Sequence, residues 1–354
     1  MLIPRNQLPQ SGSPSRRRII QGLGATLAAP WIITTSRAQT LTPLKFSLNF
    51  RPDASNAAFF LAQERGMYRA AGLDVTMDSS GGSGDVMNRL VSGVYDMGKA
   101  DINLLTEYLA RGNPNPPKAT MIMYVRSPLS VVSFKKANIA KPADLVGKSL
   151  GAPSGDGAFR MLPSFAKITN LDTTKLNLKT VDIRLRETML LRGELDGAFG
   201  FDSSIWFALK AAGAKLEDMN FMYYSDHGLD LYGNSLMVSA KFLKESPKAT
   251  AAFTQVTARA WRDAMLDPKA AIAALKKREA LADETIETER WQWLIQRQLT
   301  SPQTRAEGLG AVDRARFERC IVQVCDALGL PNRPTFEAVY DASFLPPLAD
   351  RKFA

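Results

Sequence analysis

Charged, hydroxyl and amide side chains recur in this 354-residue sequence just after short apolar runs, where a strand would give way to a helix. The first such group comprises Arg51, Asp53 and Asn56. An arginine in this place can grip a carboxylate, sulfonate or phosphate through two parallel hydrogen bonds. The alternative is a local turn contact between Arg51 and Asp53. These residue types predict non-covalent capture of a small polar molecule.

Two glycine-containing loops supply further candidates. Gly82 and Ser83 precede a predicted helix. Glycine lets the backbone approach a ligand, and the free N–H groups of a first helical turn attract negative groups. Ser83 could also serve as the N-cap of that helix, and one loop can do both. Ser154, Asp156 and Gly157 form a similar loop later in the chain, where Asp156 could accept a hydrogen bond from an amine or a ring N–H.

The remaining candidates lie at or near the ends of other predicted strands: Lys99, Asp101, Phe201, Asp202, Tyr232 and Asn234. Phe201 could stack on a planar ligand while Asp202 fixes the orientation of that ligand. The alternative is core packing for Phe201 and helix capping for Asp202. We predict that Tyr232 and Asn234 belong to a segment that returns from a second lobe and lines the same cleft.

The sequence offers few of the residues that catalysis or metal binding would need. The sequence has one histidine, His227, and two cysteines, Cys320 and Cys325, five positions apart in a helix predicted over residues 314–328. Helix positions i and i+5 lie on different faces, so we expect two free thiols, at least one of them buried, and no zinc site. The one Gly-x-Ser-x-Gly match, residues 147–151, lies at the start of a predicted strand and not at the strand-to-helix turn that a serine nucleophile needs, and no usable Cys/His pair is present. We therefore predict a protein that is not an enzyme, with no cofactor and no metal.

The first 38 residues have the features of an export signal. They contain five arginines and no acidic residue, and residues 15–20 fit the twin-arginine pattern of a polar residue, paired arginines and apolar residues. The apolar stretch 23–33 is too short to span a bilayer core of about 30 Å. Small residues, Ser36 and Ala38, stand where a cleavage site needs them. We predict cleavage after Ala38 and a periplasmic protein. The alternative is a basic tail followed by a buried helix.

Loss of this segment changes the charge balance. The whole chain has 45 basic and 35 acidic residues, and removal of five arginines leaves a net charge of about +5. That charge is too small for a nucleic-acid-binding surface, and no basic run with interleaved aromatics is present. The remaining length suits two lobes.

The apolar patterns predict an α/β protein. We expect strands over residues 44–50, 73–77, 95–100, 119–124, 131–134, 148–152, 178–181, 196–201, 220–224 and 234–239, and helices over 56–71, 85–92, 101–110, 157–168, 184–191, 205–212, 250–267, 268–278, 284–298 and 314–328. Strand–helix–strand order is typical of parallel sheets.

This order predicts two hinged lobes. Residues 39–130 plus 235–354 should form the first lobe, and residues 131–234 the second, with two crossing segments between them. We expect the C-terminal helices to pack on the first lobe. Their tryptophans, Trp261, Trp291 and Trp293, are expected in the core or between the lobes. Ligands in such folds lie at the carboxyl ends of the strands, and the lobes close around them.

Several segments resemble the periplasmic binding proteins for nitrate, sulfonates, taurine and thiamine-pyrimidine precursors. They are residues 48–53, 56–62, 66–68, 71–75, 81–83, 93–98, 144–148 and 192–198, within a region of resemblance over residues 44–245. The resemblance implies a type II periplasmic binding protein fold, an ABC permease with its ATPase as partner, and no catalysis by the binding protein. Where the thiamine-precursor branch commonly begins its first helix with histidine, this chain has Asn56.

We therefore expect a monomeric solute-binding protein that captures a small heterocyclic, aromatic or anionic organic molecule by hinge closure and delivers it to an ABC importer. One alternative is a binding protein that serves a sensor or a transporter of another class. Another is an enzyme on the same fold, such as a pyrimidine-precursor synthase or a small hydrolase. The related eukaryotic enzyme that makes the pyrimidine from its own histidine carries a cysteine cluster, and this sequence has none.

Overall fold

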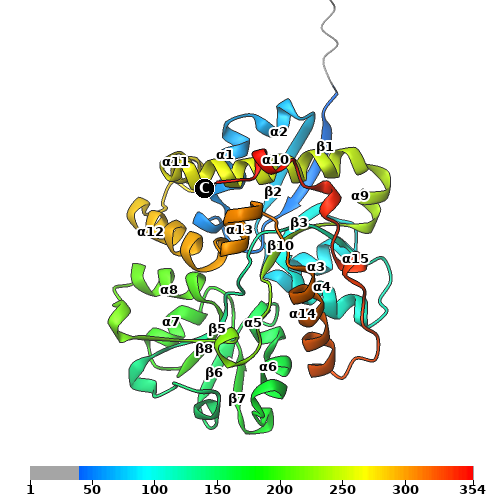
Figure 1. Ribbon diagram of the computed structural model, residues 1–354. Coiled ribbons are helices and arrows are strands. Elements are labelled where there is room, and N and C mark those ends of the chain that lie inside the picture. Colours follow the sequence, from blue (N-terminus) through cyan, green and yellow to red (C-terminus); the bar gives the residue numbers. More distant parts are fainter. Residues whose placement is uncertain (1–39, 354) are drawn as a thin grey trace, which may run out of the picture. The chain divides into compact units, whose positions relative to one another are not determined.

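The computed structural model describes residues 40–353 (Figure 1). The export signal and the cleavage after Ala38 stay predictions, because residues 1–39 lie outside the described part. From Thr40 onward the chain forms one compact unit built on two five-stranded sheets. Within this part, no helix is both long enough and apolar enough to cross a membrane.

The first sheet has the strand order β2-β1-β3-β10-β4. Its strands are β1 (Thr42–Ser47), β2 (Leu73–Asp78), β3 (Met97–Asp101), β4 (Lys118–Ile122) and β10 (Asn234–Val238). Strands β2, β1 and β3 are parallel, and β10 is antiparallel to β3 and β4. All five residues of β3 are buried, whereas burial alternates along the edge strand β2. A central strand covered on both faces needs no polar alternation, and an edge strand does.

The second sheet repeats this plan in the order β7-β6-β8-β5-β9. Its strands are β5 (Leu129–Phe134), β6 (Ser149–Ala152), β7 (Asn177–Thr180), β8 (Gly197–Phe201) and β9 (Met219–Tyr223). In each sheet the antiparallel strand is the one that the chain forms directly after crossing from the other sheet. The chain passes from β4 of the first sheet to β5 of the second, and from β9 of the second sheet back to β10 of the first. We call the two sheets with their helices the first and second lobes.

Two crossing segments, residues 123–128 and 224–233, join the lobes. Their backbones bond to each other: the Ser127 N–H donates to the Leu231 carbonyl at 3.1 Å, and the Gly233 N–H donates to the Tyr124 carbonyl at 2.9 Å. Paired extended segments of this kind suit a hinge, because a few backbone dihedrals can absorb the rotation of one lobe.

The helices are α1 (Ala57–Glu64), α2 (Met67–Ala70), α3 (Ser83–Val91), α4 (Ile102–Ala110), α5 (Gly157–Arg160), α6 (Leu162–Thr169), α7 (Arg186–Leu191), α8 (Asp202–Ala211), α9 (Ala240–Glu245), α10 (Pro247–Leu266), α11 (Pro268–Arg278), α12 (Glu284–Leu294), α13 (Pro302–Glu307), α14 (Arg314–Ala327) and α15 (Phe336–Val339). The single helix predicted over residues 56–71 is wrong. Gly66 adopts a left-handed conformation with φ of 65° between α1 and α2, which ends one helix and starts another.

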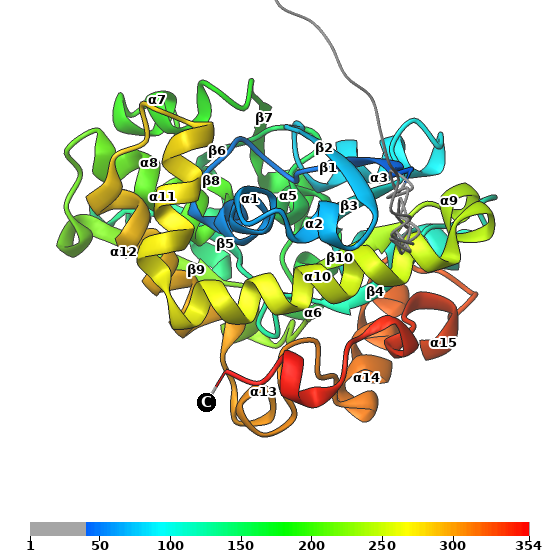
Figure 2. The same cartoon turned by 90° about the horizontal axis from the view of Figure 1, so that it is seen from above.

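The C-terminal helices, predicted to pack on the first lobe, contact the second lobe as well. Helix α10 does lie beside α1 on the first lobe (Figure 2). Helix α12, however, packs against α8 of the second lobe, and α14 packs against both α4 and α6. Amphipathic periodicity shows that a helix buries one face, but not which surface covers it.

The aromatic and thiol groups of these helices are mostly buried. Trp261 and Trp291 are core residues with ring centroids 5.5 Å apart, and Trp293 is half-buried against Phe207 and Phe221 of the second lobe. The prediction of two free cysteines, at least one of them buried, is confirmed, because Cys320 and Cys325 are both free and both buried. Burial raises the pKa of Cys320 to about 11.

Candidate functional site

A small cavity of about 30 Å³ lies between the lobes. Its walls are Asn49, Phe50, Gly82 and Ser83 from the first lobe, and Asp156, Gly157, Ile183, Arg186, Phe201 and Ser204 from the second. All of these residues are at or beyond the carboxyl ends of the parallel strands β1, β2, β6, β7 and β8. Strand ends of two α/β sheets thus face each other, which is the usual position for a ligand in such folds.

Five residues singled out from the sequence line this cavity: Gly82, Ser83, Asp156, Gly157 and Phe201. Five others were missed: Asn49, Phe50, Ile183, Arg186 and Ser204. Asn49 and Phe50 were assigned to a strand over 44–50, but β1 ends at Ser47 and the chain then leaves the sheet. Arg186 follows a strand that was predicted, so the same strand-end rule applied to β7 could have found it.

The other predicted residues lie elsewhere. Arg51 and Asp53 line a separate pocket of about 360 Å³ between α8 and the start of α12. Ser154 lines a groove at the outer side of the cleft. Asn56, Lys99, Asp101, Asp202, Tyr232 and Asn234 are buried and do not line the cavity. The ring of Tyr232 faces α14, where its hydroxyl accepts from the Asp313 N–H at 3.0 Å.

Two glycine loops bring the lobes into direct contact. The Gly84 N–H donates to the carbonyl oxygen of Gly155 across the cleft at 3.1 Å. Gly82 has a φ of 126°, and a Cβ added there would lie 2.8 Å from the same oxygen. Only glycine permits both the backbone conformation and the approach. A side chain at position 82 would therefore hold the lobes apart.

The first-lobe wall combines the start of α3 with one acceptor that is unpaired in the described part of the chain, the Oδ1 of Asn49. Ser83 is the first residue of α3, with Gly82 as N-cap, and its hydroxyl accepts from the Asp101 N–H at 3.1 Å. Asp101 in turn caps α4 through the Asn103 N–H at 2.9 Å, and burial raises the pKa of Asp101 to about 6. The buried side-chain oxygen Oδ1 of Asn49 has no partner among residues 40–353. Because Asn49 lines the cavity, that oxygen is available to an N–H or O–H of a ligand.

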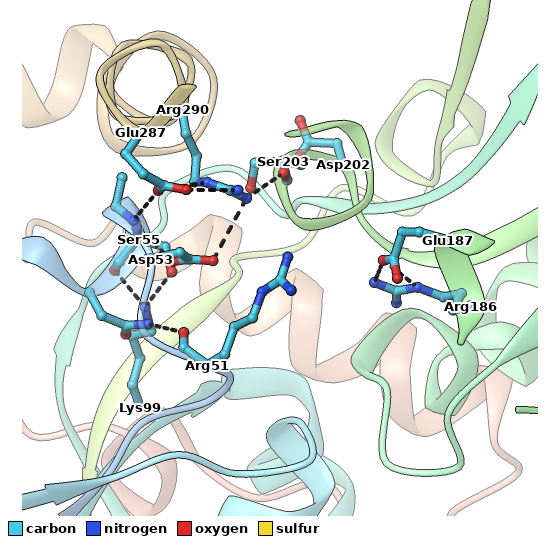
Figure 3. Close-up of polar contacts among 12 residues, drawn as sticks. Arg51, Asp53, Ser55, Lys99, Arg186, Glu187, Asp202, Ser203, Glu287 and Arg290 are labelled. Atoms are coloured by element: carbon cyan, nitrogen blue, oxygen red, sulfur yellow. Dashed lines mark hydrogen bonds and ion pairs between the residues drawn. The ribbon is translucent and has the colours of Figure 1, made fainter. Parts of the chain in front are cut away.

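The second-lobe wall is built on a buried arginine. The Nε of Arg186 donates to Oε1 of Glu187 at 3.0 Å, as Figure 3 shows. Its Nη1 donates to Oδ2 of Asp156 at 3.1 Å. The Asp156 carboxylate also caps α5 through the Ala158 N–H at 2.8 Å. Burial raises the pKa of Asp156, and Arg186 opposes that shift. Two carboxylates against one guanidinium leave this wall without a free positive charge.

Lys99 is fully buried next to three aromatic rings. Its Nζ donates to the Ser55 carbonyl at 2.7 Å (Figure 3) and lies about 6 Å from the ring centroids of Phe59, Tyr124 and Trp261. Burial lowers the pKa of Lys99 to about 7, and the Asp53 carboxylate opposes the shift. The Lys99 amine therefore bonds within the protein and does not face the cavity.

A larger groove of about 630 Å³ adjoins the cavity, and Ile183 lines both. Helices α3 and α4 form one side of it, and residues 153–155 and 180–183 form the other. Glu107 of α4 and Arg160 of α5 approach to 3.8 Å across it. The Arg160 side chain is half-exposed, whereas Glu107 is buried and bonds also to Arg111, so this long ion pair adds little to closure. The groove is the solvent-facing side of the same cleft.

Known proteins share both the sequence pattern and the fold. A model of the NMT1/THI5-like family matches residues 53–271. The chain is 23% identical over 249 residues to the riboflavin-binding protein RibY of Chloroflexus aurantiacus, 68% of each protein. It is also 23% identical over 245 residues to a formylaminopyrimidine-binding protein of Halalkalibacterium halodurans, 68% of this chain and 72% of that one.

Among solved structures, the ligand-binding component of an ABC-type import system from Staphylococcus aureus superposes with a TM-score of 0.65 at 14% identity. The superposition covers 88% of this chain and all of that one. The two-lobed periplasmic binding protein fold predicted from the sequence is confirmed by this likeness. Because the family model covers more than half of its length, this chain belongs to the NMT1/THI5-like family.

Proposed function

We propose that this protein is an extracytoplasmic solute-binding protein that holds a small organic molecule between its two lobes for an ABC importer. The observation that carries the proposal is the interlobe cavity, whose walls come from the strand ends of both sheets. A molecule held there contacts both lobes at once, so its binding energy favours the closed form. The two curated relatives are binding proteins by name, which supports the same role.

The cavity walls favour a planar, hydrogen-bonding heterocycle. Phe50 and Phe201 can pack on the faces of a ring, and the free oxygen of Asn49 can accept from a ring N–H or an amine. Arg186 is already neutralised by Asp156 and Glu187. A sulfonate or carboxylate in this cavity would meet the Asp156 carboxylate beside an already paired Arg186, so anionic ligands are disfavoured there. Riboflavin and formylaminopyrimidine, named for the two relatives, are both nitrogen heterocycles.

Binding requires the lobes to move apart and close again. The cavity of about 30 Å³ equals the volume of roughly one water molecule, which is far less than a ring compound needs. We keep the division of residues 39–130 plus 235–354 into the first lobe and 131–234 into the second as a proposal. Its boundaries shift to the strand ends, because β5 begins at Leu129 and β10 at Asn234, and we assign the hinge to the two crossing segments. Rotation there would widen the cleft along the groove beside Ile183 and admit the ligand.

The wider assignments follow from the family. We propose an ABC permease with its ATPase as the partner, the periplasm as the location, and a monomer as the working state. Arg51, Asp53, Asn56, Lys99, Asp101, Ser154, Asp202, Tyr232 and Asn234 then act mainly by shaping the lobes around the ligand. Gly82, Ser83, Asp156, Gly157 and Phe201 would contact it.

A thermal-shift screen tests the ligand class. We expect a pyrimidine, purine or flavin compound to raise the melting temperature. At a concentration 100 times its dissociation constant, a ligand adds about 2.7 kcal/mol of stability, or roughly 5 °C for a chain of this size. Alkanesulfonates and aromatic acids serve as matched anions and should give no shift. A shift with the sulfonates alone would contradict the proposed charge preference, and a shift with no class would contradict the proposed function.

A further inference from the structure

One C-terminal segment contacts both lobes and the hinge. It consists of α12 and the π-helix Ile295–Leu299 that continues it, and we call residues 284–299 the strut. On the first lobe, the Glu287 carboxylate accepts from the Ala54 N–H at 2.7 Å, in the loop that follows β1. Glu287 also receives two hydrogen bonds from Arg290, at 3.0 and 3.1 Å. The strut is thereby fixed to the loop that leads from the cavity wall into α1.

Arg290 carries this network to the second lobe. Its Nη1 donates to the Ser203 carbonyl in the first turn of α8 at 2.9 Å and lies 3.7 Å from Oδ2 of Asp53 (Figure 3). Only 3% of its side chain is exposed, and its guanidinium lies 5.1 Å from the ring centroid of Phe207. A buried guanidinium with its hydrogen bonds satisfied on two lobes holds their separation at that point more firmly than an exposed ion pair would.

Asp202 is the second anchor of the strut on this lobe. Its Oδ2 accepts from the Trp293 Nε1–H at 2.7 Å and from the Tyr223 hydroxyl at 2.8 Å, and the Gln298 amide donates to both of its oxygens at 3.1 Å. Asp202 is fully buried and directly follows Phe201, the aromatic wall of the cavity. The orientation of Phe201 therefore depends on how the strut holds Asp202.

Gln298 links this anchor to the hinge. Its carbonyl accepts from the Val125 N–H of the first crossing segment at 2.9 Å, while its side chain holds Asp202. The residue lies in the π-helix, whose widened turn closes with the Thr300 N–H on the Ile295 carbonyl at 3.1 Å. Such π-turns occur frequently at functional sites.

We propose that the strut is a third interlobe connection, a pivot that fixes the angle between the lobes and the position of Phe201. Arg290, Trp293 and Gln298 are its positioning residues. The proposal rests on the hinge closure described above. It adds that closure turns about the strut as well as about the two crossing segments, so weakening the strut widens the range of lobe angles in the protein without ligand.

Two tryptophans of α12 provide a matched test. The Trp293 N–H reaches Asp202 on the second lobe, whereas the Trp291 N–H donates to the Ala264 carbonyl within the first lobe at 3.1 Å. Trp293→Phe and Trp291→Phe each remove one such bond from the same helix. The readout is the distribution of distances between the lobes, measured by double electron–electron resonance between two spin labels. The labels are attached to cysteines introduced at Val94 of the first lobe and Leu216 of the second, which are both exposed. The native thiols are buried and react slowly.

We expect Trp293→Phe to shift this distribution to longer distances and to broaden it, and Trp291→Phe to leave it unchanged. Should Trp293→Phe fail to fold, Gln298→Met removes the two Gln298 bonds to Asp202 and is expected to give the same broadening. Equal distributions in the Trp293 and Trp291 variants would overturn the pivot, as would an unchanged distribution in both strut variants. The distance measurement uses no ligand, so a result that overturns the pivot would leave the solute-binding proposal intact. A ligand screen without any thermal shift would contradict the proposed function and would not change the distances by which the pivot is tested.

Discussion

Replacement of Arg186 by methionine is expected to lower the free energy of unfolding by about 3–5 kcal/mol, because it leaves the buried Asp156 carboxylate and the half-buried Glu187 carboxylate without their cation. Only 2% of the Arg186 side chain is exposed, and it bonds to Asp156, Glu187 and the Phe199 carbonyl. Methionine keeps about the length of the stem of the arginine side chain and removes the guanidinium with its donors. Urea unfolding followed by circular dichroism gives the value directly.

Arg184→Met is the matched control for this prediction. Arg184 lies two residues before the start of α7, its side chain is 84% exposed, and within residues 40–353 its one ion pair is with the half-exposed Asp182. Its replacement should leave the unfolding midpoint almost unchanged. Equal losses of stability in the two variants would show that the buried charge network of Arg186 is not the cause of the loss.

Replacement of Gly82 by alanine is expected to weaken ligand binding by about 5- to 150-fold. The added Cβ would lie 2.8 Å from the Gly155 carbonyl oxygen, which belongs to the opposite lobe. Forcing an extra carbon into a closely packed contact costs about 1–3 kcal/mol, which corresponds to that range of affinity. The clash exists only when the lobes are closed, so it acts on binding. The positive φ at position 82 strains alanine in the open and closed forms alike, so that strain lowers the stability of both forms and does not change the affinity for the ligand.

Gly81→Ala provides the comparison for Gly82→Ala, since a Cβ at position 81 would meet nothing closer than the Asp85 carboxylate at 3.9 Å. Isothermal titration with the compound found in the thermal screen measures both affinities. Equal affinities for the two variants would show that the glycine loops do not approach each other in the ligand-bound form.

Much of the fold was predictable because local patterns determine it. The alternation in residues 73–77 and the glycines at 81–84 place β2 and the start of α3 within a few residues of their observed positions. Two parallel units joined by crossing strands follow from the repeated strand–helix order. The left-handed Gly66 was not recognised, because the apolar spacing continues across it.

The candidate site was only half predictable for a different reason. A strand end can be located from sequence, but the direction of its side chains depends on what packs against the sheet. Lys99 and Asp101 end β3 as predicted, yet the aromatic side chains of α1 and α10 enclose Lys99, and Asp101 turns to cap α4. Asp202 meets partners 91 and 96 residues away, on a helix whose lobe assignment no local pattern reveals.

The central claim is that one small molecule is gripped by both lobes at the strand ends, and a crystal structure of the protein with the compound found in the thermal screen tests it most directly. We predict a ligand whose ring lies between Phe50 and Phe201, within hydrogen-bonding distance of Asn49 on one lobe and of Asp156 or the Gly157 backbone on the other. A ligand that touches only one lobe, or that lies wholly in the outer groove between Glu107 and Arg160, would contradict the account.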